Sequence, residues 1–416
     1  MNVVRSLLGL PLCLALLSVS LPSLRAQTGL ALQLQPLSDA APVTVPVGSP
    51  TPIPSDAALL KAANDLLSNV KLGDGRSRID VVIDPLIDGV TGAQSKATQL
   101  QQERIVELIR TRYPRFRVLP FTTDSILKQP LVLVGTFTAI NNDGAPTGPR
   151  DAYRICLAFA DLKSRTVVSK GVARALPDGV DPTPVAFFKD SPGYARDAAT
   201  ESYVRSCQGA KAGDAVDRTY TDNVLAAALV NEGIEAYNAG RYKAALELYE
   251  NALSMPGGEQ LRTYNGIYLA SYKLHRNRTA MDAFGKMIDL SLRTSDRLAI
   301  KFLFKPGSTQ FYYDRDDRAP YQAWIGKIAQ RTATNRSCLE VVGHTSATGM
   351  PAMNDRLSML RADFIRERVE AEETILQGHL LSDGKGSREM IVGTGRDDPS
   401  DALDRRVEFK VVKCST

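Results

Sequence analysis

The sequence lacks closely spaced cysteines and has few histidines. No two of its five cysteines form a CxxC pair, and its three histidines are His275, His344 and His379. Structural zinc sites use close Cys or His spacings, and an isolated histidine has no neighbour in sequence for metal binding or proton transfer. We therefore expect no metal site, and we interpret His344 as structural.

Recognisable catalytic motifs and a large charge excess are also missing. There is no Gly-rich phosphate loop, nucleophile elbow or paired-carboxylate motif, so we expect neither an enzyme nor a cofactor. The 51 Lys+Arg nearly balance the 46 Asp+Glu, which argues against nucleic acid as a partner. Asp80, Asp84 and Asp88 recur every four residues without the spacing of a calcium loop, so we expect them at strand ends and turns.

The first 26 residues have the pattern of a secretory signal. Arg5 precedes an apolar run over 7–21, and "SLRA" stands before Gln27 as a small-residue cleavage site. An uncleaved anchor is the alternative, but the run is broken by Pro11 and is shorter than the ~20 residues of a spanning helix. Cleavage would leave 49 basic against 46 acidic residues. No later run is long enough to cross a bilayer, so we predict an exported, soluble mature chain whose membrane association is indirect.

Four cysteines follow the predicted signal. An even number in an exported chain indicates disulfides, and four cysteines allow three connectivities. The connectivity that stays within domains pairs Cys156 with Cys207 and Cys338 with Cys414.

A Pro-rich segment and an α/β domain come next. Residues 27–55 are rich in Pro, Val, Thr and Gln and predict an extended linker. Residues 56–215 predict an α/β sandwich that begins with the helix "AALLKAANDLLSNV". The patterns that follow are "RIDVVID", a helix in "TQLQQERIVELIRTRY", and the strands "RFRVLPF", "LVLVGTFTAI", "YRICLAFADL" and "RTVVSKGVARAL". The last two are close enough to form a hairpin.

Residues 223–292 change to a helical pattern with a repeat. In "NEGIEAYNAGRYKAALELYENALSMPG" small and large residues alternate, and a looser copy follows 35 residues on, with Ala280 matching Ala245 and Phe284 matching Tyr249. This segment resembles tetratricopeptide repeats. Two such hairpins leave a face uncovered, so a flanking helix or a partner must cover it. The resemblance implies a groove for a protein partner, and a rigid spacer is the alternative.

Residues 293–416 predict a βαβαββ domain. "LAIKFLF" and "SCLEVVGHT" predict strands, and "APYQAWIGKIAQRTA" and "MNDRLSMLRADFIRERVE" predict helices. "EMIVGTG" and "RRVEFKVVKC" predict two more strands. We place Trp324, Ile325 and Ile328 inward. In the second helix we expect a buried stripe of Met353, Leu357, Leu360 and Phe364, with Arg361 at its flank.

Three ordered motifs of this segment are similar to those of the OmpA-like peptidoglycan-binding domain. "VVGHTSATG", "NDRLSMLRA" and "LDRRVEF" stand where that family has GHTD, NxxLSxxRA and NRRVE. The resemblance implies that Arg361 takes the carboxylate of the diaminopimelate side chain of peptidoglycan. It also places Ser346, Thr345, Asn354 and Arg405 at the binding site.

The sequence departs from the family at two positions. Ser346 replaces the acid of GHTD that would take the ammonium of the ligand, which lowers the expected affinity by ~10-fold, on the order of 1 to 2 kcal/mol. Asp404 replaces the usual Asn before the two arginines. Asp355 could restore a negative charge from the helix start, where an acid also stabilises the helix.

Together these patterns predict a multidomain α+β protein of the Gram-negative periplasm, associated with the wall or outer membrane. Its predicted partners are peptidoglycan and an unidentified envelope protein bound through residues 223–292. The alternative is a scaffold or assembly factor of the periplasm that has lost peptidoglycan binding.

Overall fold

A computed structural model describes residues 51–72, 78–146, 150–193, 196–294, 297–311, 320–391, 393, 401 and 403–414. The expected signal peptide, the alternative of a membrane anchor, and most of the expected linker lie outside these residues. In the described parts, the protein is a mixed α/β structure with eleven α-helices and two mixed sheets. None of the described helices is both long and apolar enough to span a bilayer.

The first sheet has five strands in the order β2-β1-β3-β4-β5. Its strands are β1 (Ile79–Ile83), β2 (Phe116–Leu119), β3 (Leu131–Ile140), β4 (Ala152–Asp161) and β5 (Thr166–Ala175). β1 is parallel to both β2 and β3, whereas β3, β4 and β5 are antiparallel. The strands therefore lie where the sequence patterns place them, and β4 and β5 form the expected hairpin.

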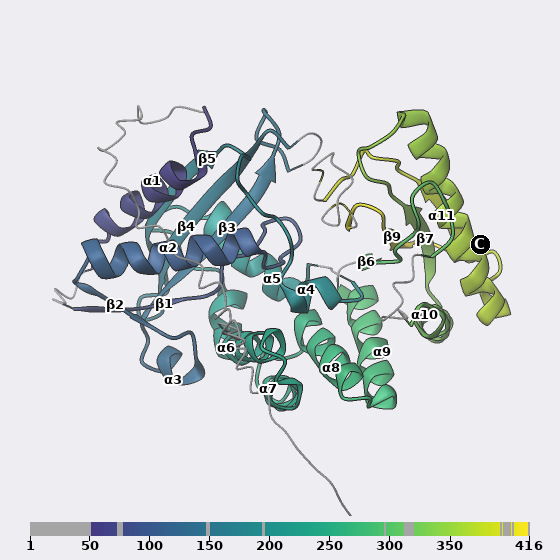
Figure 1. Ribbon diagram of the computed structural model, residues 1–416. Helices are drawn as coiled ribbons and strands as arrows, with labels where there is room; N and C mark the ends of the chain where they lie inside the picture. Colours follow the sequence, from purple (N-terminus) through teal and green to yellow (C-terminus); the bar gives the residue numbers. More distant parts are fainter. Residues whose placement is uncertain are drawn as a thin grey trace, which may run out of the picture. The chain divides into compact units, whose positions relative to one another are not determined.

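Helices cover both faces of this sheet, as expected for an α/β sandwich. On one face α1 (Ser55–Ser68) and α2 (Lys96–Arg112) lie side by side (Figure 1). Gly171 of β5 faces α1 so closely that an added Cβ would lie 1.8 Å from the carbonyl oxygen of Ala62. The apolar core on the other face joins the sheet to α5 (Ala198–Val204), the π-helix η1 (Arg205–Gly209) and the first half of α6 (Arg218–Asn238). Two short helices, α3 (Thr123–Ile126) and α4 (Ala186–Asp190), complete this part.

The sheet recruits one residue from the segment that the sequence assigns to the linker. Ile53 forms a parallel bridge with Ala175, and its amide and carbonyl bond to the backbone of Arg174 and Leu176. The ordered domain thus begins a few residues before the expected boundary.

The helical segment consists of two antiparallel hairpins. α6 pairs with α7 (Tyr242–Leu253), and α8 (Leu261–Lys273) pairs with α9 (Asn277–Thr294) (Figure 1). Tyr249 of α7 is fully buried between two glycines of the flanking helices. A Cβ added to Gly233 of α6 or to Gly266 of α8 would lie 2.5 Å from its ring. Small residues beside an aromatic ring therefore set the spacing of these helices.

The open face of the second hairpin is covered from within the chain. Trp324 of α10 (Tyr321–Asn335) donates its indole N–H to the hydroxyl of Tyr268 at 2.8 Å and stacks on Phe284 at 5.7 Å. Arg331 of α10 pairs with Asp289 of α9. The helix that covers the second hairpin is thus α10.

The C-terminal domain has the expected βαβαββ order, with a sheet in the order β6-β9-β7-β8. Its elements besides α10 are β6 (Arg297–Ile300), β7 (Cys338–Gly343), α11 (Pro351–Glu372), the 3-10 turn η2 (Thr374–Leu376), β8 (Leu380–Gly384) and β9 (Val407–Val412). β8 is parallel to β7, and β9 is antiparallel to its neighbours β6 and β7. Trp324, Ile325 and Ile328 are buried as expected.

One predicted strand is misplaced. The run "EMIVGTG" (389–395) predicts a strand, but residues 389–391 form a turn and loop, and the strand is β8 at 380–384. The carbonyls of residues 389–391 accept hydrogen bonds from arginine side chains instead of a strand partner: Arg406 bonds to Glu389, and Arg150 bonds to Met390 and Ile391. The rest of the run, apart from Gly393, lies outside the described residues.

Both predicted disulfides are present. Cys156 of β4 is bonded to Cys207 of η1, and Cys338 of β7 is bonded to Cys414 after β9. Each bridge therefore joins two segments of the same domain, as expected.

Candidate binding site in the C-terminal domain

The loop after β7 lies in a tight corner between α11 and the sheet. A Cβ on Gly343 would lie 2.0 Å from the carbonyl oxygen of Ser358, so the helix approaches the strand end at a distance that only glycine allows. The amide of His344 bonds to the carbonyl of Arg406, and that of Thr345 bonds to the carbonyl of Gly386. These bonds fix the direction in which the loop leaves the sheet.

Ser346, Thr345 and Asn354 come together in this corner. All three are buried. The Asn354 amide nitrogen donates to the carbonyl oxygens of Ser346 at 3.4 Å and Thr348 at 3.1 Å, and the Ser346 and Thr348 hydroxyls lie 3.2 Å apart. Asn354 thus fastens the loop to the first turn of α11.

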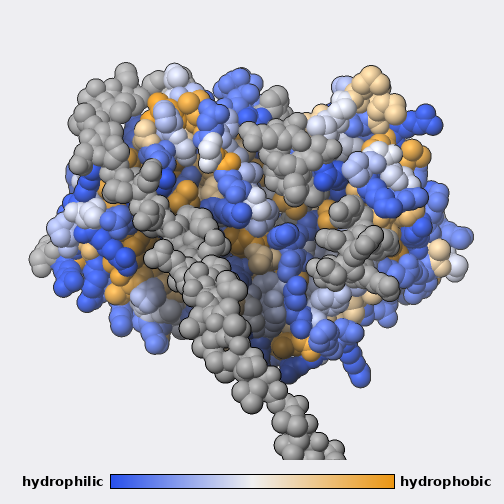
Figure 2. Space-filling model, in the orientation of Figure 1, coloured by the Kyte–Doolittle hydropathy of each residue, from blue (hydrophilic) through white to orange (hydrophobic). Residues whose placement is uncertain are grey.

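The buried stripe of α11 differs from the one expected. Met353 is 57% exposed and Leu360 is 45% exposed, and Leu357 and Phe364 are half-buried. Around α11 apolar groups stand among polar ones at the surface (Figure 2). The inward positions are Asn354, Ser358, Arg361, Ala362, Ile365 and Val369. The inner face of the first half of the helix is polar because it covers loops and strand ends, which offer hydrogen-bonding backbone groups.

Arg361 is consequently inside the domain and not at the flank of the stripe. Its side chain is among the largest fully buried ones, at 1% exposure. Its Nε donates to the carbonyl oxygen of Ser308, its Nη2 donates to that of Lys305, both at 3.2 Å, and its Cζ lies 4.9 Å from the centre of the Phe304 ring. Arg361 and Asn354 share the inward face of α11, two turns apart. The guanidinium is thus held rigidly, with its fork of N–H donors directed at oxygen atoms.

The acids near this corner have other partners. Asp355 forms an ion pair with Arg388 at 2.5 Å. Asp404 is fully buried, and its carboxylate accepts hydrogen bonds from the amides of Ile391 at 2.5 Å and Gly393 at 2.7 Å. The sequence analysis did not predict that Asp404 fixes this loop. The replacement of the expected Asn by an acid at this position was the feature that could have indicated it.

The two arginines before β9 have different surroundings. Arg405 is half-buried, whereas Arg406 is buried and bonds to Glu408 at 2.6 Å. Glu408 also pairs with Arg297 and lies 3.9 Å from His344. Burial, and next the charge of Arg406, lower the pKa of His344 to about 2, so this histidine stays neutral. It is fully buried under the loop.

Comparisons with known proteins give limited information. No family model matches the chain, and no curated protein matches it. Among solved structures, it is similar to the cell wall anchor of the T6SS from Pseudomonas aeruginosa, with 23% identity over 28% of this chain and 79% of that one, at a TM-score of 0.23.

Two further solved structures show a similar degree of likeness. The peptidoglycan-associated lipoprotein from Burkholderia pseudomallei has 20% identity over 27% of this chain and 88% of that one, at a TM-score of 0.24. The periplasmic domain of Helicobacter pylori MotB has 18% identity over 29% and 76%, also at 0.24.

Proposed function

We propose that residues 293–416 form an OmpA-like domain that binds the diaminopimelate stem peptide of peptidoglycan, in a non-enzymatic protein of the Gram-negative periplasm. The observation that supports this most is Arg361, a buried guanidinium on the inward face of α11 whose donors already bind two oxygen atoms. Its surroundings supply the rigidity that recognition of a carboxylate needs.

Binding would exchange the oxygen partners of Arg361. The ligand carboxylate takes the Nε and Nη2 donors in place of the carbonyls of Ser308 and Lys305, because a charge-assisted, bidentate pair is stronger than two bonds to neutral carbonyls. The segment 305–308 must then move away from the guanidinium. Thr345 and Ser346 offer hydroxyls to the ammonium of the ligand, and Asn354 holds their loop in place.

The test is the affinity of residues 27–416, called the secreted chain below, for a diaminopimelate-containing muropeptide, measured by calorimetry. Arg361→Lys keeps the charge but loses the planar fork, and we expect it to weaken binding by at least ~10-fold. Ser346→Asp restores an anion for the ammonium and is expected to tighten binding by a similar factor. Arg356→Lys, an exposed position of the same helix, is the matched control.

The possible results distinguish a loss of ligand binding from a loss of folding. Equal affinity of wild type and Arg361→Lys, with both chains folded by circular dichroism, would show that this guanidinium does not hold the ligand. Retention on isolated sacculi that is unchanged by the same substitution would lead to the same conclusion.

A second candidate function is a periplasmic scaffold or assembly factor that no longer binds peptidoglycan, and the missing carboxylate at Ser346 favours it. In both readings we propose that an envelope protein binds through residues 223–292. A pulldown with the full secreted chain tests this. Recovery of one defined protein from an extract cleared of peptidoglycan supports the scaffold, and recovery that requires sacculi supports the wall-bound reading.

A further inference from the structure

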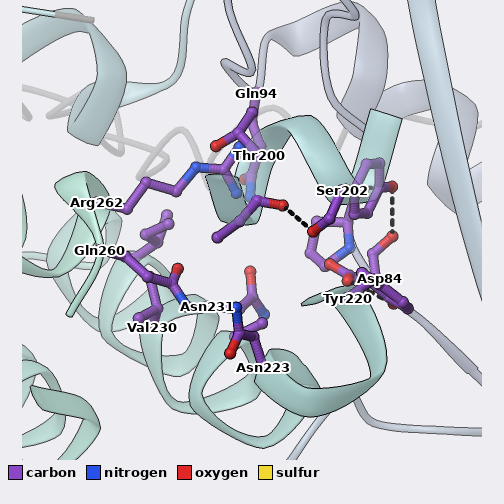
Figure 3. Close-up of a pocket in the computed structure, with 15 residues that line it drawn as sticks. Asp84, Gln94, Thr200, Ser202, Tyr220, Asn223, Val230, Asn231, Gln260 and Arg262 are labelled. Carbon is purple, nitrogen blue, oxygen red and sulfur yellow. Dashed lines mark hydrogen bonds between the residues drawn. The ribbon is translucent and has the colours of Figure 1, made fainter. Parts of the chain in front are cut away.

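A polar cavity lies where β1 ends in the first domain. Asp84, the residue that follows β1, lines it together with Gln94, Thr200, Asn231, Gln260 and Arg262 (Figure 3). β1 is parallel to both of its neighbours, and the chain runs from β1 to β2 on one side and then to β3 on the other. The carboxyl end of a strand at such a switch point is the place where open α/β sheets bind ligands.

Asn231 supplies a hydrogen-bond acceptor without a partner. Its side chain is 5% exposed, and its Nδ2 donates to Glu235 at 3.0 Å. Its Oδ1 is buried and receives no hydrogen bond from the parts of the chain that the structure describes. An unsatisfied buried oxygen costs about 1 to 3 kcal/mol, and a ligand N–H group would remove this cost.

Asp84 supplies an acid on one side of the cavity. It is 7% exposed, and its Oδ2 accepts a hydrogen bond from the hydroxyl of Tyr220 at 2.9 Å. The hydroxyl of Tyr203 bonds to the backbone on both sides, reaching the carbonyl of Asp84 and the amide of Gly135, and so fixes the strand end. Burial raises the pKa of Asp84 to about 7, which means that a nearby cation would readily ionise it.

Arg262 supplies a cation on the opposite side. Figure 3 shows its side chain reaching from α8 toward Gln94 and Thr200, with Asp84 and Tyr220 farther across the cavity. Its Nη2 donates to the carbonyl of Gly92 at 2.6 Å, and its Cζ lies 5.8 Å from the ring of Phe188. Among the described residues no carboxylate pairs with it. The cavity therefore has a cationic donor, Arg262, and a neutral acceptor, Asn231, on the side of the helices, and the acid Asp84 across from them.

We propose that this cavity binds the head group of a free α-amino acid, whose carboxylate pairs with Arg262 and whose ammonium donates to Asn231 Oδ1 and Asp84. The cavity volume is about 30 Å³, room for about two waters. The ammonium and one carboxylate oxygen take these two positions, and the side chain points out through the mouth. Glycine and alanine are the smallest amino acids that carry this head group. The site is separate from the proposed peptidoglycan site and does not depend on it.

Calorimetry of the full secreted chain with glycine and with L-alanine tests the proposal. Asn231→Leu removes the acceptor at nearly constant volume, and Arg262→Gln removes the cation. We expect each substitution to weaken glycine binding by about tenfold or more. Arg293→Gln removes an exposed arginine of α9 that pairs with Glu259, and is expected to leave binding unchanged. Glycinamide, which lacks the carboxylate, is expected to bind wild type more weakly and to be insensitive to Arg262→Gln.

The thermal unfolding midpoint provides an independent readout, because a ligand that binds the native state raises it. If neither glycine nor L-alanine at about 10 mM raises the midpoint or produces binding heat, the cavity holds only water and the proposal is wrong. It is also wrong if glycine binds wild type and both cavity variants with equal affinity.

Discussion

The contact of Tyr249 with two glycines predicts an unusual sign for a common substitution. Gly→Ala inside a helix normally stabilises by about 1 kcal/mol, because alanine has less backbone freedom to lose. At Gly233 the added methyl would lie 2.5 Å from the ring of Tyr249, and the ring cannot retreat because Gly266 allows no more space on its other side. Overpacking of this kind costs about 1 to 3 kcal/mol. With the upper end of that range, Gly233→Ala lowers the free energy of unfolding by about 2 kcal/mol.

A second background isolates the clash. Tyr249→Ala alone is expected to cost about 3 to 5 kcal/mol, as for other large aromatic side chains in a core. In that background the methyl of Gly233→Ala meets no ring, so the same substitution should stabilise by about 1 kcal/mol. The coupling energy between the two positions is then about 3 kcal/mol, well above that of independent sites.

Urea unfolding followed by far-UV circular dichroism gives these values, and Gly285→Ala is the matched control. Gly285 is inside α9, and its added Cβ would meet the flexible chain of Lys327 at 3.3 Å. We expect this control to be neutral or slightly stabilising. The reasoning is refuted if Gly233→Ala stabilises the protein as much as Gly285→Ala does, or if Tyr249→Ala leaves its effect unchanged.

Three further predictions concern titratable groups and a disulfide. The pKa of Asp84 is about 7 in the folded protein, against an ordinary value of 3.8, so its stabilising contribution is present below pH 3.8 and lost as pH rises through 7. Asp84→Asn should flatten this loss of about 4 kcal/mol in urea unfolding measured as a function of pH. Folding lowers the pKa of His344 from 6.5 to about 2, so the protein loses stability as pH falls below 6.5. His344→Leu should therefore reduce the slope of the free energy of unfolding against pH in the acid range. Replacing Cys338 and Cys414, which are 76 residues apart, with serine should lower the free energy of unfolding by about 4 kcal/mol under oxidising conditions, and leave wild type and variant alike after reduction.

Local patterns predicted the first sheet because its strands satisfy simple rules. β3 is mostly apolar, with Thr136 and Thr138 as its polar residues, and all ten of its residues are buried, as a strand covered on both faces should be. β4 and β5 follow with a connection too short for anything but a hairpin. The two disulfides were predictable because each joins segments within one domain.

The C-terminal domain shows where the same rules fail. The run at 389–391 is more apolar than β8, but its carbonyls bond to arginine side chains that come from distant parts of the sequence. β8 lies at the edge of its sheet, and its Leu381 is 53% exposed. Its sequence therefore resembles that of a buried strand only weakly. Hydrogen bonds to these arginines thus explain why the predicted strand is a loop, and the sequence analysis did not predict the strand at 380–384.

The residues of the candidate site stay a prediction, whereas the predicted orientation of α11 was wrong. The motifs identified Ser346, Asn354 and Arg361, but an apolar stripe was assumed to be the inner face of α11. The inner face is instead the one whose polar side chains can donate hydrogen bonds to the backbone carbonyls of neighbouring loops. Asn354 donates to the carbonyls of residues 346 and 348, and Arg361 donates to those of residues 305 and 308. A helix that covers loops is an exception to the rule that the apolar stripe is buried.

The cover of the helical hairpins limits how a partner can bind them. Trp324 of α10 contacts Tyr268 and Phe284, so the aromatic surface of the second hairpin is not available in the intact chain. A fragment of residues 223–292 would expose these rings and could bind apolar surfaces that the whole protein never meets. α6 sets the same limit at the other end, because its first half belongs to the core of the α/β domain and its second half to the hairpins. A partner that the intact protein binds must therefore contact the outer faces of the helices. Binding experiments need the complete chain, because a fragment exposes the inner aromatic rings as well.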